Sequence, residues 1–113
     1  MDLTKKKCEP CEGGVKPFDP KETETYMTYL KTPWEVVSDG KKIEHKYKFK
    51  DFVEAIKFVN KVAEVAEEDQ HHPDIFVSYS RVTITLWTHA IGGLSVNDFI
   101  LASKIELINP RNN

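Results

Sequence analysis

The sequence predicts an α+β fold, a two-layer sandwich in which three helices cover one face of a four-stranded antiparallel sheet. Three observations predict it: three patterns typical of helix starts, two pairs of alternating segments joined by short turns, and the order α-β-β-α-β-β-α. The 113 residues, 40% apolar and 30% charged, suit one compact domain. We expect an irregular arm over residues 1–18, a single domain over 19–109 and a tail over 110–113.

The first helix is predicted over residues 20–31. Asp19 is a good helix cap, Glu22 follows it by three residues, and Pro20 suits the first helical position. Pro33 disfavours a helical conformation in the residue before it, so the helix should end there.

A β-hairpin is expected next. Residues 34–37 are separated by an Asp-Gly turn at 39–40 from a segment over 43–49 that alternates apolar and charged residues. His45 falls on an apolar position of this alternation, so we expect it to be partly buried and structural.

A second helix is predicted from Phe52 to residue 68 or 69. Asp51 and Glu54 form the capping pattern at its start. Apolar residues then recur in steps of three and four, which predicts a single buried face made of Phe52, Ile56, Val59, Ala63 and Ala66.

A second hairpin should follow Pro73. Residues 75–79 and 82–89 are joined by a tight connection near residues 80–81. In the second of these strands His89 shares the face of the threonines and Trp87, so we expect its ring to point toward a ligand and not into the core.

The third helix, predicted over residues 95–108, starts with Ser95 and Asp98 in the capping pattern. Its apolar residues form two nearly opposite stripes, and two stripes need two partners. One should face the sheet, and the other predicts self-association through this helix, as a homodimer or homotetramer.

Charge and composition exclude several classes of function. The formal net charge of -2 and the pI near 6.1 give no general attraction to nucleic acid. The chain has no apolar run of the roughly 18 residues that a membrane span needs and no signal-like start. We therefore expect no nucleic-acid or membrane partner and a cytoplasmic location, with the nucleus as an alternative.

Cys8 and Cys11 are separated by two residues, a spacing found in metal knuckles and redox pairs. A structural zinc site normally needs four ligands, and the sequence has no second pair of this kind. We expect a reduced arm without metal, and metal or redox chemistry there is the alternative.

Three of the four histidines lie in two short motifs, the run from Gln70 to Asp74 that includes His71 and His72, and the pair Thr88-His89. Imidazoles titrate near neutral pH and need partners for two ring nitrogens, so such a cluster is unusual in an ordinary core. It predicts proton-transfer chemistry or a metal site.

Together with neighbouring residues these motifs resemble the pterin-4a-carbinolamine dehydratases. The resemblance covers about residues 30–108 and is most specific in the His-His-Pro element followed by Thr-His. It is carried by Trp34, Glu67, His71, His72, Pro73, Thr88, His89, Gly93, Leu94, Ser95 and Asp98.

The resemblance implies an enzyme that dehydrates 4a-hydroxytetrahydropterin, the product left by aromatic amino acid hydroxylases, to quinonoid dihydropterin and water. This reaction supports tetrahydrobiopterin recycling and needs no cofactor and no metal. By the same resemblance His71 and His89 are the acid/base pair, His72 contacts the pterin, and Glu67 orients a histidine or binds the ring. The substrate-binding residues would further include Pro73, Asp74, Thr88 and Trp34.

Some residues keep a second interpretation. Asp98 matches a family position, but helix capping explains it fully and is the interpretation we favour. Trp34 walls the pocket or belongs to the core. Gln70 and Ile75 depart from animal members, which carry Asp and an aromatic residue there, so any anionic help to His71 from position 70 is lost.

Two other classes of function compete with the dehydratase. A zinc-dependent hydrolase would hold its metal with His71 or His72, His89 and Asp74, although adjacent histidines rarely bind one metal together. A non-catalytic binding module, similar to the transcription-cofactor role of animal dehydratases, would use the helix over 95–108.

Overall fold

The computed structural model describes residues 2–8 and 16–108. It confirms the predicted α+β fold and the predicted order of helices and strands. The elements, in chain order, are η1 (Leu3–Lys5), α1 (Pro20–Met27), β1 (Glu35–Val37), β2 (Lys42–Lys48), α2 (Phe52–Asp69), β3 (Asp74–Ser78), β4 (Arg81–Leu86), η2 (His89–Ile91) and α3 (Val96–Ile108).

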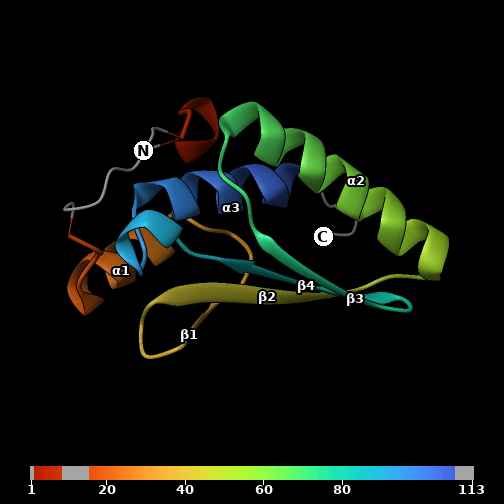
Figure 1. Cartoon of the computed structure of the whole chain (residues 1–113), viewed down its shortest axis with the longest axis horizontal. Coiled ribbons are helices and arrows are strands. Elements are labelled where there is room, and N and C mark those ends of the chain that lie inside the picture. Colours follow the sequence, from red (N-terminus) through yellow and green to blue (C-terminus); the bar gives the residue numbers. More distant parts are fainter. Residues whose placement is uncertain (1, 9–15, 109–113) are drawn as a thin grey trace.

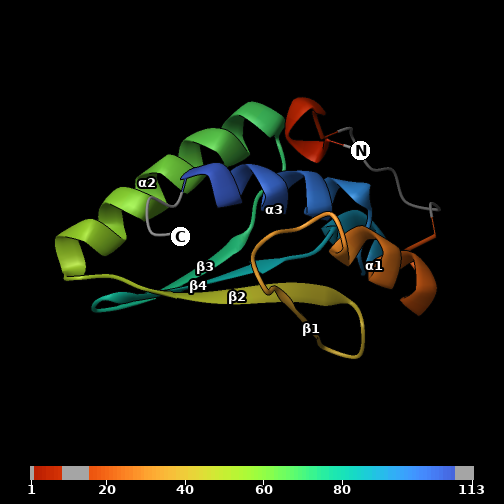
Figure 2. The ribbon, with the colours of Figure 1, turned by 180° about the vertical axis from the view of Figure 1, so that it is seen from behind.

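The four strands form one antiparallel sheet in the order β1-β2-β4-β3. Figure 1 shows α2 and α3 lying across one face of this sheet, with α1 at one end of the molecule. The view from behind in Figure 2 shows the same two layers. Among the described residues, no helix lies on the face of the sheet turned away from α2 and α3.

The helix ends follow the capping chemistry. Asp19 and Glu22 make the full capping box at the start of α1, and Asp51 caps α2 through the amide of Glu54. The first helix is shorter than predicted, because after Met27 the backbone tightens into i to i+3 hydrogen bonds as far as the amide of Leu30. The second helix has the predicted length.

Both predicted hairpins are present, but the second strand of the second hairpin is shorter than expected. Regular pairing of β4 ends at Leu86, and His89 begins the short helix η2. The expectation that His89 lies on a strand is therefore wrong. The reason is a local loop closure, in which Thr88 pairs with Gly93 and reverses the chain.

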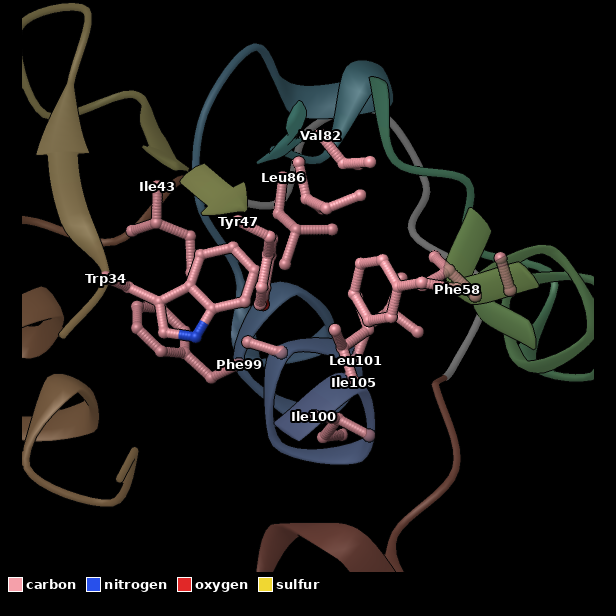
Figure 3. Close-up of a cluster of buried hydrophobic side chains, with 14 of the residues drawn as sticks. Trp34, Ile43, Tyr47, Phe58, Val82, Leu86, Phe99, Ile100, Leu101 and Ile105 are labelled. Atoms are coloured by element: carbon pink, nitrogen blue, oxygen red, sulfur yellow. The ribbon is translucent and has the colours of Figure 1, made fainter. Parts of the chain in front are cut away.

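The core lies between the sheet and the two long helices. Figure 3 shows Val82 and Leu86 of β4 facing Leu101 and Ile105 of α3, with Phe58 of α2 beside them. These five side chains are buried. Burial of each such side chain contributes roughly 1.5 to 3 kcal/mol, so this layer accounts for much of the stability of the fold.

The buried face of α2 differs from the predicted one. Its buried residues are Ala55, Phe58, Val62, Ala66 and Asp69, whereas Phe52 is half exposed. Most of the buried positions lie one residue before the predicted ones. The reason is that the sequence of this helix contains two overlapping apolar stripes with helical spacing. Asp69, an acid, completes the buried face and forms an ion pair described below.

The helix α3 is buried on nearly all sides, so the expected exposed stripe is absent from its described residues. Leu107 is the exposed apolar side chain of this helix. The second face is covered by α2 and by the N-terminal segment, whose Leu3 is 2% exposed and belongs to the core. The arm, expected to be irregular, thus contains the short helix η1 at residues 3–5 and supplies the missing partner. No described helix is long and apolar enough to cross a membrane.

Candidate active site

The candidate site begins where α2 ends. Gln70 adopts a left-handed backbone conformation with φ of 53°, which stops the helix. The amide of His71 then donates to the carbonyl of Ala66 over 3.1 Å, closing the end of the helix in the manner of a Schellman motif. This turn delivers His71 and His72 at a fixed point between α2 and β3.

His71 is held by a buried carboxylate. Its Nε2 lies 2.7 Å from Oδ1 of Asp98, and the side chains of the two residues are 11% and 0% exposed. Asp98 lies in the first turn of α3, so the contact joins α3 to the end of α2. A carboxylate only accepts hydrogen bonds, which places the proton of the His71 ring on Nε2.

The second oxygen of Asp98 is also satisfied. Oδ2 accepts from the Oγ1 hydroxyl of Thr88 over 2.8 Å and from the amide of Ser95 over 3.0 Å. Thr88 in turn lies 2.8 Å from the hydroxyl of Ser95. Asp98 therefore caps α3 through the amide of Ser95, as the sequence predicts, and its other oxygen contacts His71.

His72 lies in a different environment from its neighbour. Its Nε2 is 2.6 Å from Oε2 of Glu67, and both side chains are largely exposed, at 56% and 72%. Glu67 is on α2, slightly more than one turn before the histidine. The contact pairs the acid with His72 and not with His71.

A third group of side chains joins the start of β3 to the segment after β4. The indole Nε1 of Trp87 donates to Oδ2 of Asp74 over 3.0 Å. The ring of His89 stacks on Trp87, with 3.9 Å between the centroids and 27° between the planes. The ammonium of Lys42 lies 4.5 Å from the centre of the Trp87 ring. His89 itself is exposed.

Behind His71, a buried ion pair fixes the last turn of α2. Nζ of Lys104 on α3 is 2.7 Å from Oδ2 of Asp69, whose side chain is 3% exposed. Cys8 packs at the same place, with its thiol 3.4 Å from the carbonyl oxygen of Asn97. Burial, and secondarily the charge of Asp69, raises the pKa of Cys8 to about 12, which favours the protonated thiol at neutral pH.

Three other residues singled out in the sequence lie in the core, in a loop, or outside the described residues. Trp34 is buried in the core, with its ring 5.8 Å from that of His45 and 6.5 Å from that of Tyr47, so the core interpretation holds for it. Pro73 lies in the loop that leads into β3. Cys11 falls outside the described residues.

The fourth histidine is the structural residue that the sequence predicts. His45 is partly buried, between the rings of Trp34 and Tyr47. Its burial lowers the pKa of its imidazole, against a smaller opposing effect of a hydrogen bond with the backbone of Pro33. His45 thus provides an internal control for the three histidines of the motifs.

In the described part of the chain, no three His, Cys, Asp or Glu residues come close enough to hold a metal ion. The ligand set required by the hydrolase alternative, His71 or His72 with His89 and Asp74, is therefore not assembled. The arrangement instead pairs each histidine with its own partner: a buried carboxylate, an exposed carboxylate and an indole. Such an arrangement suits the transfer of protons to and from a bound molecule.

Sequence reasoning missed Trp87, Lys42, Asp69 and Lys104 as neighbours of the site. The strand alternation places Trp87 on the uncovered face of the sheet, and this was a usable signal. Asp69 gave no such signal, because an acid at a helix end normally indicates solvent exposure.

The fold and the site define a class of protein, an α+β sandwich that bears a histidine and carboxylate site suited to acid/base catalysis. Residues 16–108 match the family model described as pterin 4 alpha carbinolamine dehydratase. The chain belongs to this family, and its enzymatic class is that of the hydro-lyases. The predicted resemblance is confirmed.

Individual relatives agree with this assignment. The chain is 45% identical to a pterin-4-alpha-carbinolamine dehydratase of Rickettsia bellii over 106 residues, which cover 94% of this chain and 93% of the relative. It also matches the crystal structure of a transcriptional coactivator/pterin dehydratase from Brucella melitensis, with a TM-score of 0.76, 33% identity, and coverage of 82% and 98% of the two chains.

A more distant structure shares the fold alone. It is a pterin dehydratase-like protein identified as a RuBisCO assembly factor in the alpha-carboxysome, with a TM-score of 0.59, 18% identity, and coverage of 69% of this chain and 90% of that chain.

Proposed function

We propose that this protein dehydrates 4a-hydroxytetrahydropterin to quinonoid dihydropterin and water in the cytoplasm, by histidine acid/base catalysis and without a cofactor. The observation that supports it best is the contact between His71 and the fully buried Asp98, in a chain that belongs to the dehydratase family. The substrate would come from an aromatic amino acid hydroxylase.

The reaction needs two proton transfers. One proton goes to the departing 4a-hydroxyl, which leaves as water, and one is lost from a ring nitrogen as the C=N bond forms. A positioned acid or base is typically worth about 10² to 10⁴ in rate. Histidine suits both roles, because its ordinary pKa lies near neutral pH.

The contacts of each histidine support a division of roles. Since Nε2 of His71 is engaged by Asp98, its Nδ1 is the nitrogen left to accept or return a substrate proton. His89 is exposed and serves as the second member of the acid/base pair. His72, linked to Glu67, is assigned to the pterin or its 4a-hydroxyl.

The experiment is the rate of dehydration of 4a-hydroxytetrahydropterin, generated in situ by an aromatic hydroxylase. We expect the wild-type protein to accelerate the reaction and His71→Ala, His72→Ala and His89→Ala each to lose roughly 10² or more of that acceleration. The matched control is His45→Gln, which changes the one histidine outside the motifs and should keep the rate. Equal rates with and without wild-type protein would contradict the proposal.

A second candidate function is binding to another protein, which the description of the Brucella protein as a transcriptional coactivator/pterin dehydratase favours. The helix expected to carry such contacts, α3, is largely buried within the protomer.

Self-association as a homodimer or homotetramer through this helix would thus have to use its exposed Leu107. Sedimentation velocity of wild-type protein and Leu107→Ser tests it, and an unchanged mass in the variant would contradict this interface.

A further inference from the structure

His89 is the least constrained of the three motif histidines. Its side chain is exposed, and in the described part of the chain its ring has no hydrogen bond, in contrast to His71 and His72. The backbone around it is a single 3-10 turn, closed by hydrogen bonds from the amides of Ile91 and Gly92. This turn fixes the backbone position of His89. The orientation of its ring must therefore be fixed by side-chain contacts.

The ring contact of His89 is with Trp87. The centroid distance of 3.9 Å and the angle of 27° describe a stacked pair, which covers one face of the imidazole. Trp87 lies just after the end of β4, and its side chain points to the uncovered face of the sheet, opposite to the buried Leu86. Trp87 is therefore not a core residue, and its position calls for another explanation.

Trp87 is itself held from two sides. Its Nε1 donates to Oδ2 of Asp74 at the start of β3, and the ammonium of Lys42 from β2 lies against its ring. Asp74 follows the His72-Pro73 pair directly. The indole thus contacts residues of two strands, β2 and β3, and it relates the position of His89 to the position of the His-His-Pro element.

We propose that Trp87 is a positioning residue that holds the His89 imidazole in its productive orientation, with Asp74 and Lys42 fixing the indole. This inference rests on the proposed function, in which His89 transfers a proton. Trp87 acts through His89 by stacking and does not itself exchange a proton with the substrate.

The expected size of the effect follows from side-chain geometry. The χ1 angle of a histidine has three staggered wells and χ2 is broadly two-fold, so an unsupported imidazole spreads over about six orientations. If one of these is productive, loss of the stack should lower kcat about sixfold. KM should change less, because the substrate contacts of His72 remain.

The test combines proton NMR of the imidazole with steady-state kinetics of the full chain. Stacking on an indole shifts the ring protons of His89 upfield, and the signals are assigned with His89→Asn. In Trp87→Leu we expect the upfield shift to disappear and kcat to fall about sixfold. Trp87→Phe keeps an aromatic ring and should restore most of both the shift and kcat.

Three further variants separate positioning from a general effect of substitution. Asp74→Asn keeps an oxygen acceptor for the indole and should preserve the His89 signals, whereas Asp74→Ala should move them toward those of Trp87→Leu. Phe76→Leu is the matched control, since Phe76 is an exposed aromatic residue of β3 on the same face of the sheet. It should change neither the signals nor kcat.

The outcomes are distinguishable. Unchanged His89 signals in Trp87→Leu would overturn the positioning role, whether or not kcat falls, because a fall alone would indicate contact between Trp87 and the substrate. An unchanged kcat with displaced signals would also overturn it. If wild-type protein fails to accelerate dehydration, the proposed function fails, while the NMR comparison still decides whether Trp87 holds His89.

Discussion

His71 and His72 are adjacent in sequence and are held in opposite ways. His71 faces inward to a fully buried carboxylate that accepts from two further donors, Thr88 and Ser95. His72 faces outward to Glu67 in a largely exposed pair. The comparison shows that one dipeptide can present two imidazoles in different environments, one paired with a buried carboxylate and one paired with an exposed carboxylate.

The largest expected effect comes from removing Asp98, the buried carboxylate that contacts His71. Asp98→Ala removes the partner of His71, Thr88 and Ser95 at once and leaves buried donors unsatisfied, so we expect a loss of about 3 kcal/mol in the free energy of unfolding. The dehydration rate should fall at least about 10²-fold. Urea unfolding and steady-state kinetics measure the two effects, and a stable, active variant would contradict the role given to Asp98.

Asp98→Asn separates capping from orientation. Its side-chain oxygen can still accept from the amide of Ser95, so the loss of stability should stay within about 1 kcal/mol. Its amide group would donate toward Nε2 of His71 and favour the wrong tautomer, so the rate should still fall strongly. An Asn variant with wild-type rate would show that Asp98 acts only as a cap.

The ion pair behind His71 should matter for stability nearly as much. Lys104→Met leaves the buried carboxylate of Asp69 uncompensated and should cost about 3 kcal/mol in the free energy of unfolding. The double variant Asp69→Leu with Lys104→Met replaces the pair by apolar groups and should recover most of this loss. The double-mutant cycle is measured by urea unfolding, and additive losses would rule out a direct coupling.

The exposed pair should contribute little to stability. Glu67→Gln removes the charge of the partner of His72, and we expect less than about 1 kcal/mol of change in the free energy of unfolding, decreasing further with added salt. The effect of this variant on the dehydration rate, expressed as a free energy, should exceed its effect on the free energy of unfolding. A stability loss comparable to that of Asp98→Ala would remove the contrast between the two histidines.

The smallest effect concerns pH and the histidine outside the site. Because burial lowers the pKa of His45 from its ordinary value of 6.5, the unfolded chain binds a proton more readily than the folded one. Stability is therefore lost as the pH falls below about 6.5. His45→Gln should make this loss shallower, as measured by urea unfolding between pH 5 and 7.5, and an unchanged slope would contradict it.

Much of the site was predictable, for identifiable reasons. The paired histidines and His89 could be named because such a cluster of imidazoles is unusual, whereas Glu67 could be named only through the family resemblance. The capping pattern of Ser95 and Asp98 is confirmed. The contact between Asp98 and His71 could not be derived, since the two residues are 27 positions apart and meet only when α3 packs against the end of α2. The same holds for Asp69 and Lys104.

The sequence by itself determined the order and approximate ends of the helices and strands, because caps, prolines and hydrophobic alternation act over a few residues. It also indicated the family, through the resemblance that the His-His-Pro and Thr-His motifs carry. Only the tertiary structure decided which acid serves which histidine and what covers α3. Those outcomes depend on contacts between distant segments, such as Leu3 and Cys8 against α3, and burial of this kind is a property of the packed chain and not of any local pattern.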